Sequence, residues 1–243
     1  MSGAGDARVG GARVEGARVG GAVRLAWGVA AVGTAAFAAL AIVVSNGLGD
    51  ALDRRVLLAL RGADGAARGP DWFVESVSDV TALGGYPVIG IAVAFAIAAL
   101  AAARQRTAIA FLLGAIVGGS VLSTALKLVF VRGRPDLVEH LDRTFTSSFP
   151  SAHAMVSMLA WLTLAAVLVR FVRAHRMRVL LVSAAVLLSV LIGASRVYLG
   201  VHWPSDVLAG WSAGLAWASA CWLAAHYLSE RPRRIDRLGA SAG

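Results

Sequence analysis

Six long apolar runs, separated by short segments rich in arginine, constrain this chain more than any other feature. Each run has about the 20 residues that a helix needs to cross the hydrocarbon core of a bilayer. The chain is also 58% hydrophobic, above the roughly 45–50% of a soluble domain. We therefore predict an all-α polytopic membrane protein, a six-helix bundle with spans at residues 25–45, 86–103, 108–130, 154–171, 178–194 and 207–228. Arginines precede the first run, but five more runs follow it, so we interpret it as a retained anchor and not as a signal peptide.

The placement of the arginines predicts the orientation of the bundle. Loops with an excess of basic residues stay in the cytoplasm. Here such segments are the N-terminus, the connections after the second and fourth spans, and the C-terminus. An even number of spans puts all four on one side, so we expect loops 46–85, 131–153 and 195–206 to face the outside of the cytoplasmic membrane. The net charge of +9 reflects this asymmetry, and we predict no nucleic-acid partner.

Three parts of different character divide the chain. Residues 1–24 repeat glycine, alanine, arginine and valine without an apolar helical face, and we predict a disordered basic cytoplasmic tail there. Residues 25–228 form the predicted six-helix domain, and residues 229–243 a second basic cytoplasmic tail. The first outer loop carries two short amphipathic patterns, around Leu57 and around Phe73. We expect both to be helices that lie at the outer interface or pack over the bundle.

Polar and charged residues gather at the predicted outer ends of the spans, although membrane segments usually exclude such residues unless they have a function. Lys127 is the only lysine of the chain and ends the third span, and Arg134 follows it. The remaining residues begin or end the later spans: Ser151, Ala152 and His153, then Ser195 and Arg196, then His202 and Asp206. The predicted topology puts all of them on one side of the membrane, so we expect a single site.

These residue types suit a phosphate group. Free backbone N–H groups at a helix start attract phosphate oxygens, and both His153 and His202 lie near such a start. Three cations supply fixed positive charge, and Asp206 can orient one histidine. Whether Arg132 also contacts a diphosphate or a headgroup is left open. The sequence has no glycine-rich nucleotide loop and no cysteine–histidine cluster for a metal.

The spacing of these residues resembles that of the type-2 phosphatidic acid phosphatase superfamily, in its membrane lipid phosphatase branch. Three motifs carry the resemblance: Lys127, six residues, Arg134-Pro135; Pro150-Ser151-Ala152-His153, usually Pro-Ser-Gly-His; and Ser195-Arg196, five residues, His202, three residues, Asp206. Ala152 replaces the family's glycine. Alanine is disfavoured at that position only if the backbone needs a positive φ.

The resemblance implies a role for each residue. His202 attacks phosphorus and becomes phosphorylated, Asp206 orients His202, and His153 protonates the leaving oxygen and then activates a water. The phosphate oxygens are bound by Lys127, Arg134, Ser151, Ala152 and Arg196. Because three cations can neutralise the phosphate, the resemblance implies no metal and no cofactor.

We therefore expect a lipid phosphate phosphatase with its site at the outer membrane–water interface. Phosphatidic acid, phosphatidylglycerol phosphate and polyprenyl phosphates or diphosphates are the candidate substrates that the family implies. Two alternatives stay open. One is a non-catalytic lipid-phosphate binder or transporter on the same scaffold, and the other is a vanadate-dependent haloperoxidase. The sequence determines neither the lipid nor the oligomeric state.

Overall fold

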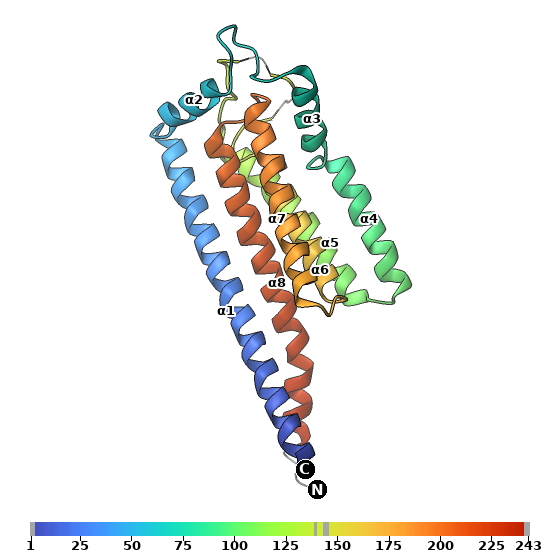
Figure 1. The fold of residues 1–243 in the computed structure, drawn as a ribbon. Coiled ribbons are helices and arrows are strands. Elements are labelled where there is room, and N and C mark those ends of the chain that lie inside the picture. The colour runs from blue at the N-terminus through green and yellow to red at the C-terminus, as the bar shows by residue number, and fades with distance from the viewer. Residues whose placement is uncertain (1–2, 139, 143–145, 241–243) are drawn as a thin grey trace.

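The chain folds into a bundle of α-helices that run up and down a common axis (Figure 1). This computed structural model describes residues 3–138, 140–142 and 146–240. Within them the elements are α1 Gly3–Ser45, α2 Asp50–Ala59, α3 Asp71–Ala82, α4 Tyr86–Ala102, α5 Arg106–Val129, α6 Ala152–Val169, α7 His175–Tyr198 and α8 Pro204–Ala240. The prediction of an all-α fold is confirmed.

Five of the described helices are long and apolar enough to cross a membrane, namely α5, α6, α7 and long parts of α1 and α8. The predicted span 86–103 corresponds to α4, which has 17 residues and passes the same test only together with α3, at a bend of 48°. The six predicted spans are therefore five single helices and one bent pair. The predicted span 178–194 is shorter than α7, because polar residues at both ends of α7 remain helical.

Both ends of the chain are helical beyond the predicted domain boundaries. α1 begins at Gly3 and α8 continues to Ala240, so residues 3–24, which the sequence predicts as part of a disordered tail, are helical in the described structure. α1 and α8 lie side by side along the bundle (Figure 1). Residues 1–2 and 241–243 of the predicted tails lie outside the described residues. The domain limits 25–228 stay a prediction.

Two short helices, α2 and α3, lie at the end of the bundle opposite to the chain termini (Figure 1). Leu57 on α2 is fully buried in a cluster with Val197 and Trp203. On α3, the ring of Phe73 meets that of Tyr198 edge-on, with centroids 5.4 Å apart. The two amphipathic patterns of the first outer loop are therefore helices, and they pack against the ends of α7 and α8.

The contact between α6 and α8 is close enough to require glycine. A Cβ on Gly210 would lie 2.6 Å from the carbonyl oxygen of Ser151, and a Cβ on Gly214 would lie 2.7 Å from that of Met155. At their starts the two helices are joined by a hydrogen bond of 3.0 Å from the Ser151 N–H to the Asp206 carbonyl. Backbone contact therefore fixes how the starts of α6 and α8 lie against each other.

Candidate active site

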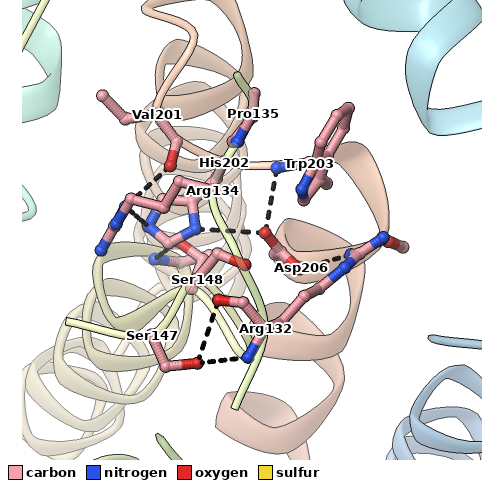
Figure 2. A network of polar contacts seen from close by, with 12 residues as sticks. Arg132, Arg134, Pro135, Ser147, Ser148, Val201, His202, Trp203 and Asp206 are labelled. Atoms are coloured by element: carbon pink, nitrogen blue, oxygen red, sulfur yellow. Dashed lines mark hydrogen bonds and ion pairs between the residues drawn. The ribbon is translucent and has the colours of Figure 1, made fainter. Parts of the chain in front are cut away.

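The three motif-bearing segments meet at the end of the bundle where α2 and α3 lie. The Ser148 N–H donates to the carbonyl of Arg132 at 3.0 Å, and the Leu141 N–H donates to the carbonyl of Leu199 at 3.1 Å. The hydrogen bond between the starts of α6 and α8 completes the connection. Residues from both parts of the α5–α6 connection, from the α7–α8 connection and from the start of α8 thereby come into one neighbourhood (Figure 2).

His202 and Asp206 form a buried pair at the start of α8. His202 Nδ1 lies 3.4 Å from Asp206 Oδ2, and the same oxygen accepts the Trp203 N–H at 3.0 Å. Asp206 is fully buried and His202 is 2% exposed. The second ring nitrogen, Nε2, lies 3.3 Å from Nη1 of Arg134 (Figure 2). Each ring nitrogen of His202 therefore has one charged neighbour.

These two neighbours determine the tautomer of His202. An ionised carboxylate only accepts hydrogen bonds and a guanidinium only donates them. Nδ1 therefore carries the proton, and Nε2 presents its lone pair. Burial lowers the pKa of His202 to about 4, against the opposing effect of the hydrogen bond to Asp206. The imidazole is consequently neutral at pH 7, with the electron pair of Nε2 directed at Arg134.

Arg134 and Lys127 bring positive charge to this pair. Arg134 Nη1 donates to the carbonyl of Val201 at 2.7 Å, and Lys127 Nζ donates to the carbonyl of Ser147 at 2.6 Å. Lys127 lies within electrostatic range of Arg134 and of Arg196. Since backbone carbonyls hold two of the cations, their positions are set before any ligand binds.

Arg196 is the most enclosed of the three cations. It is fully buried in the last turn of α7, where Nη1 contacts Asp142 Oδ2 at 2.7 Å and Thr81 Oγ1 at 3.1 Å. Its buried Nε has no acceptor among the described residues. Burying a donor without an acceptor is costly, and an anionic oxygen would supply the missing partner.

Ser151 and Ala152 form the start of α6. Ser151 is buried and acts as the N-cap, with Oγ accepting the Ala154 N–H at 3.5 Å. Arg104 is the only non-glycine residue in the described part of the chain that has a positive φ. Ala152 therefore has a φ that any residue adopts, and its replacement of the family's glycine causes no backbone strain.

His153 lies in the first turn of α6 and is half-buried. It is within electrostatic range of Arg196, His202 and Lys127. The turn between α3 and α4 borders it, since a Cβ on Gly84 would lie 3.5 Å from His153 Cδ2. The structure thus brings both histidines of the predicted site close to the same cations.

Two arginines have acidic partners that the sequence does not predict. Arg132 contacts Asp206 Oδ1 at 2.7 Å and Asp53 Oδ2 at 2.9 Å, so its guanidinium is already paired and does not face an open phosphate position. Arg196 likewise pairs with Asp142. The sequence offers only a weak signal for these contacts. The acids of the outer loops have no periodicity that tells which arginine each one meets.

Comparisons with known proteins identify the family and the fold of this chain. The model of the PAP2 superfamily matches residues 108–230, about half of the chain, which include all of the predicted site residues. Phosphatidylglycerophosphatase B of Bacillus subtilis (strain 168) is 38% identical over 98 residues, which are 39% of this chain and 47% of that protein. The chain therefore matches about half the length of this curated relative.

Two solved structures share the fold. The crystal structure of a transmembrane PAP2-type phosphatidylglycerolphosphate phosphatase from Bacillus subtilis matches with a TM-score of 0.71 and 25% identity, over 82% of this chain and 96% of that one. Aquifex aeolicus LpxE matches with a TM-score of 0.55 and 23% identity, over 70% of this chain and 94% of that one. The match to the family model, with the motifs and the helical bundle in agreement, shows that this chain belongs to the PAP2 superfamily.

Proposed function

We propose that this protein is a lipid phosphate phosphatase that needs no metal ion and works through a phosphohistidine on His202. The observation that carries the proposal is the buried pair of His202 and Asp206, in which the unprotonated Nε2 of His202 faces Arg134. A neutral imidazole that a carboxylate orients, and that fixed positive charge surrounds, is suited to attack a phosphorus atom with anionic oxygens.

The first step transfers the phosphoryl group to the enzyme. The lone pair on His202 Nε2 attacks phosphorus, and the bond between phosphorus and the lipid oxygen breaks. His153, in its protonated form, gives its proton to the leaving oxygen. The ring of His202 becomes positively charged as the N–P bond forms, and Asp206 stabilises that charge.

The second step releases inorganic phosphate. His153, now neutral, takes a proton from a water molecule, whose oxygen attacks phosphorus. The N–P bond breaks, and the electron pair returns to Nε2 of His202. Phosphate leaves, and both histidines are back in the protonation states from which they started.

The cations stabilise the phosphate oxygens in both steps. Arg134 and Lys127 are held by backbone carbonyls, and the unused Nε of Arg196 is a ready donor. Ser151 and the N–H groups at the start of α6, including that of Ala152, add the positive end of a helix dipole. Because their charge is fixed, these groups can do the work that Mg²⁺ does in other phosphoryl-transfer enzymes.

The relatives support a membrane lipid as the substrate. The curated relative and the first solved structure bear names that state action on phosphatidylglycerol phosphate. We therefore rank this lipid ahead of phosphatidic acid and polyprenyl diphosphates. The site lies at the opposite end of the bundle from the arginine-rich connections (Figure 1). By the positive-inside rule we propose that the site faces the outside of the cytoplasmic membrane.

Release of inorganic phosphate from these three lipids, in detergent micelles with EDTA present, tests the proposal. Wild type should release phosphate, and His202→Ala should lose more than about 1,000-fold in kcat because the nucleophile is gone. His175→Ala is the matched control, because this histidine is exposed at the start of α7, far from the site, and should keep full activity.

Two results would contradict this mechanism. Turnover in His202→Ala at the wild-type rate would exclude His202 as the nucleophile. Strict dependence on Mg²⁺ would show that the three cations do not suffice to neutralise the phosphate.

A further inference from the structure

Arg132 lies between the carboxylate that orients His202 and two carboxylates at the start of α2. Its Nη1 contacts Asp206 Oδ1 at 2.7 Å, and its Nη2 contacts Asp53 Oδ2 at 2.9 Å and Asp50 Oδ1 at 3.1 Å. The two nitrogens of one guanidinium thus join α8 to α2. Neither helix is near the other in sequence.

The inner members of this chain of contacts are buried. Asp206 is fully buried, Asp53 is 3% exposed, and the side chain of Arg132 is 13% exposed. Asp50 is 57% exposed at its side chain, so water screens its contribution. The strongly interacting set is therefore Asp206, Arg132 and Asp53.

Asp53 also holds the start of α8 directly. Its Oδ1 accepts the Ser205 N–H at 2.9 Å, and its Oδ2 accepts the Ser205 hydroxyl. Arg132 Nη1 donates to the same hydroxyl at 2.8 Å. A carboxylate from α2 therefore caps the N-terminus of the helix that carries Asp206, as a side-chain cap within one chain segment would.

We infer that Arg132 and Asp53 are positioning residues for the nucleophile, which hold Asp206 so that its second oxygen faces His202. This inference rests on the proposed function of His202. Asp206 has two oxygens, and the structure divides them: Oδ1 goes to Arg132, while Oδ2 goes to His202 and the Trp203 N–H. Fixing Oδ1 fixes the direction of Oδ2.

The charges explain why Asp53 is needed beside Arg132. Arg132 alone would neutralise Asp206, which would then stabilise a positively charged His202 less well. With Asp53 on its other side, the guanidinium is shared, and the set of Asp206, Arg132 and Asp53 keeps a net charge of about −1 next to the imidazole. This negative charge stabilises His202 most when the ring carries the phosphoryl group, because the ring is then positively charged.

The guanidinium also contacts an aromatic ring, since Arg132 Cζ lies over the Trp203 ring, 5.5 Å from its centroid. A planar fork that bridges two carboxylates and stacks on an aromatic ring is specific to arginine. Lysine could keep the charge but could not reach both carboxylates with the same geometry.

Steady-state kinetics of Arg132→Ala, Arg132→Lys and Asp53→Asn test this role. We expect kcat to fall about 10- to 100-fold in Arg132→Ala, as for other residues that orient a catalytic group, with KM within about threefold of wild type because phosphate contacts are intact. Arg132→Lys should regain part of kcat, and Asp53→Asn should lose about tenfold. Arg54→Ala is the control, because this α2 arginine is exposed and should leave kcat unchanged.

Binding of vanadate and of inorganic phosphate, measured without turnover, provides a second readout. Vanadate adopts the trigonal-bipyramidal geometry of the transition state and needs an oriented His202. Its affinity should therefore fall with kcat in Arg132→Ala, whereas the affinity for phosphate should not change. Arg132→Ala could fail to fold because two buried carboxylates lose their partner. In that case the affinities for vanadate and for phosphate are compared in Arg132→Lys and Asp53→Asn.

Three outcomes would overturn the inference. An unchanged kcat in Arg132→Lys and Asp53→Asn would show that Asp206 needs no positioning. A rise in KM and a matching loss of phosphate affinity would make Arg132 a ligand of the substrate. A lower thermal midpoint with unchanged kcat would leave only a structural role. If wild type binds vanadate but releases no phosphate, the proposed function fails. The vanadate affinities of the variants then test by themselves whether Arg132 and Asp53 position His202.

Discussion

His202 owes its state to burial and to two neighbours of opposite charge. Asp206 accepts from Nδ1, and Arg134 can only donate toward Nε2. In water a histidine exchanges between tautomers and titrates near neutral pH. Within this site a single tautomer is compatible with both contacts. The ring therefore has, before a substrate arrives, the tautomer that the proposed nucleophile needs.

The acid limb of the pH profile tests this state. Burial lowers the pKa of His202 from 6.5 to about 4, so the ring stays neutral, and competent to attack, until the pH falls to about 4. We expect kcat/KM to fall below that pH, and not between pH 7 and 5. The stability of the folded protein should also decrease as the pH falls. In the unfolded chain His202 binds a proton below about pH 6.5, whereas in the folded chain it does so only near pH 4. The free energy of unfolding therefore decreases progressively as the pH falls from 6.5 to 4.

The measurement is kcat/KM from pH 3.5 to 8 on a lipid phosphate, with the thermal midpoint recorded at each pH. A limb centred near 6.5 would mean that solvent reaches the ring and that His202 is not buried as described.

At the scale of the helices, the contact between α6 and α8 sets the geometry of the site. Gly210 and Gly214 let the two backbones approach, and the Ser151–Asp206 hydrogen bond joins the helix starts. The histidines of the site stand on either side of this junction. Any change that separates the helices should move His153, the proposed general acid, away from His202, the proposed nucleophile.

Gly210→Ala should therefore reduce both stability and activity. Its Cβ would meet the Ser151 carbonyl at 2.6 Å and the Ala154 Cβ at 2.9 Å, and neither group can move without its helix. Overpacking of this kind costs about 1–3 kcal/mol. The thermal midpoint in detergent and kcat measure the effect. Gly114→Ala is the matched control, because a Cβ on Gly114 has no neighbour within 4 Å and alanine favours the helix.

If Gly210→Ala were as stable and active as Gly114→Ala, then the close approach of α6 and α8 would not be needed for the site.

Local sequence patterns predict the helices well and the long-range partners poorly. Apolar runs of spanning length and the amphipathic pattern around Leu57 are visible in the sequence, since each depends on neighbouring residues alone. The bend between α3 and α4 and the helical backbone of 3–24 depend on packing, which those patterns do not encode. The contact of Arg132 with Asp53 joins residues 79 positions apart, and no periodicity marks such a pair. The roles of the predicted site residues stay predictions.

For the molecule as a whole, the two ends of the bundle differ in charge and in content. The connections α4–α5 and α6–α7 and both termini lie toward one end and carry most of the arginines, whereas α2, α3 and the site lie at the other (Figure 1). A bilayer with a negative cytoplasmic surface favours one orientation of such a bundle. We expect the site end to be outside.

Cysteine labelling in intact cells measures this orientation. Ala63→Cys, between α2 and α3, and Ala174→Cys, between α6 and α7, replace exposed alanines at opposite ends. Both are made with Cys221→Ala, because Cys221 is the only natural cysteine. A membrane-impermeant maleimide should label only Ala63→Cys in intact cells and both variants after permeabilisation. Labelling of Ala174→Cys alone in intact cells would reverse the orientation.

The backbone junction between α6 and α8 has a consequence for engineering headgroup preference. Main-chain contacts hold the starts of α6 and α8 together, so the relative position of the two histidines does not depend on the side chains of the neighbouring loops. The exposed loop residues near the site are free of this constraint, and loops tolerate variation far better than packed helices do. A library that seeks a new lipid preference should therefore randomise exposed residues of the loops near the site and keep Gly210, Gly214 and the helix starts unchanged.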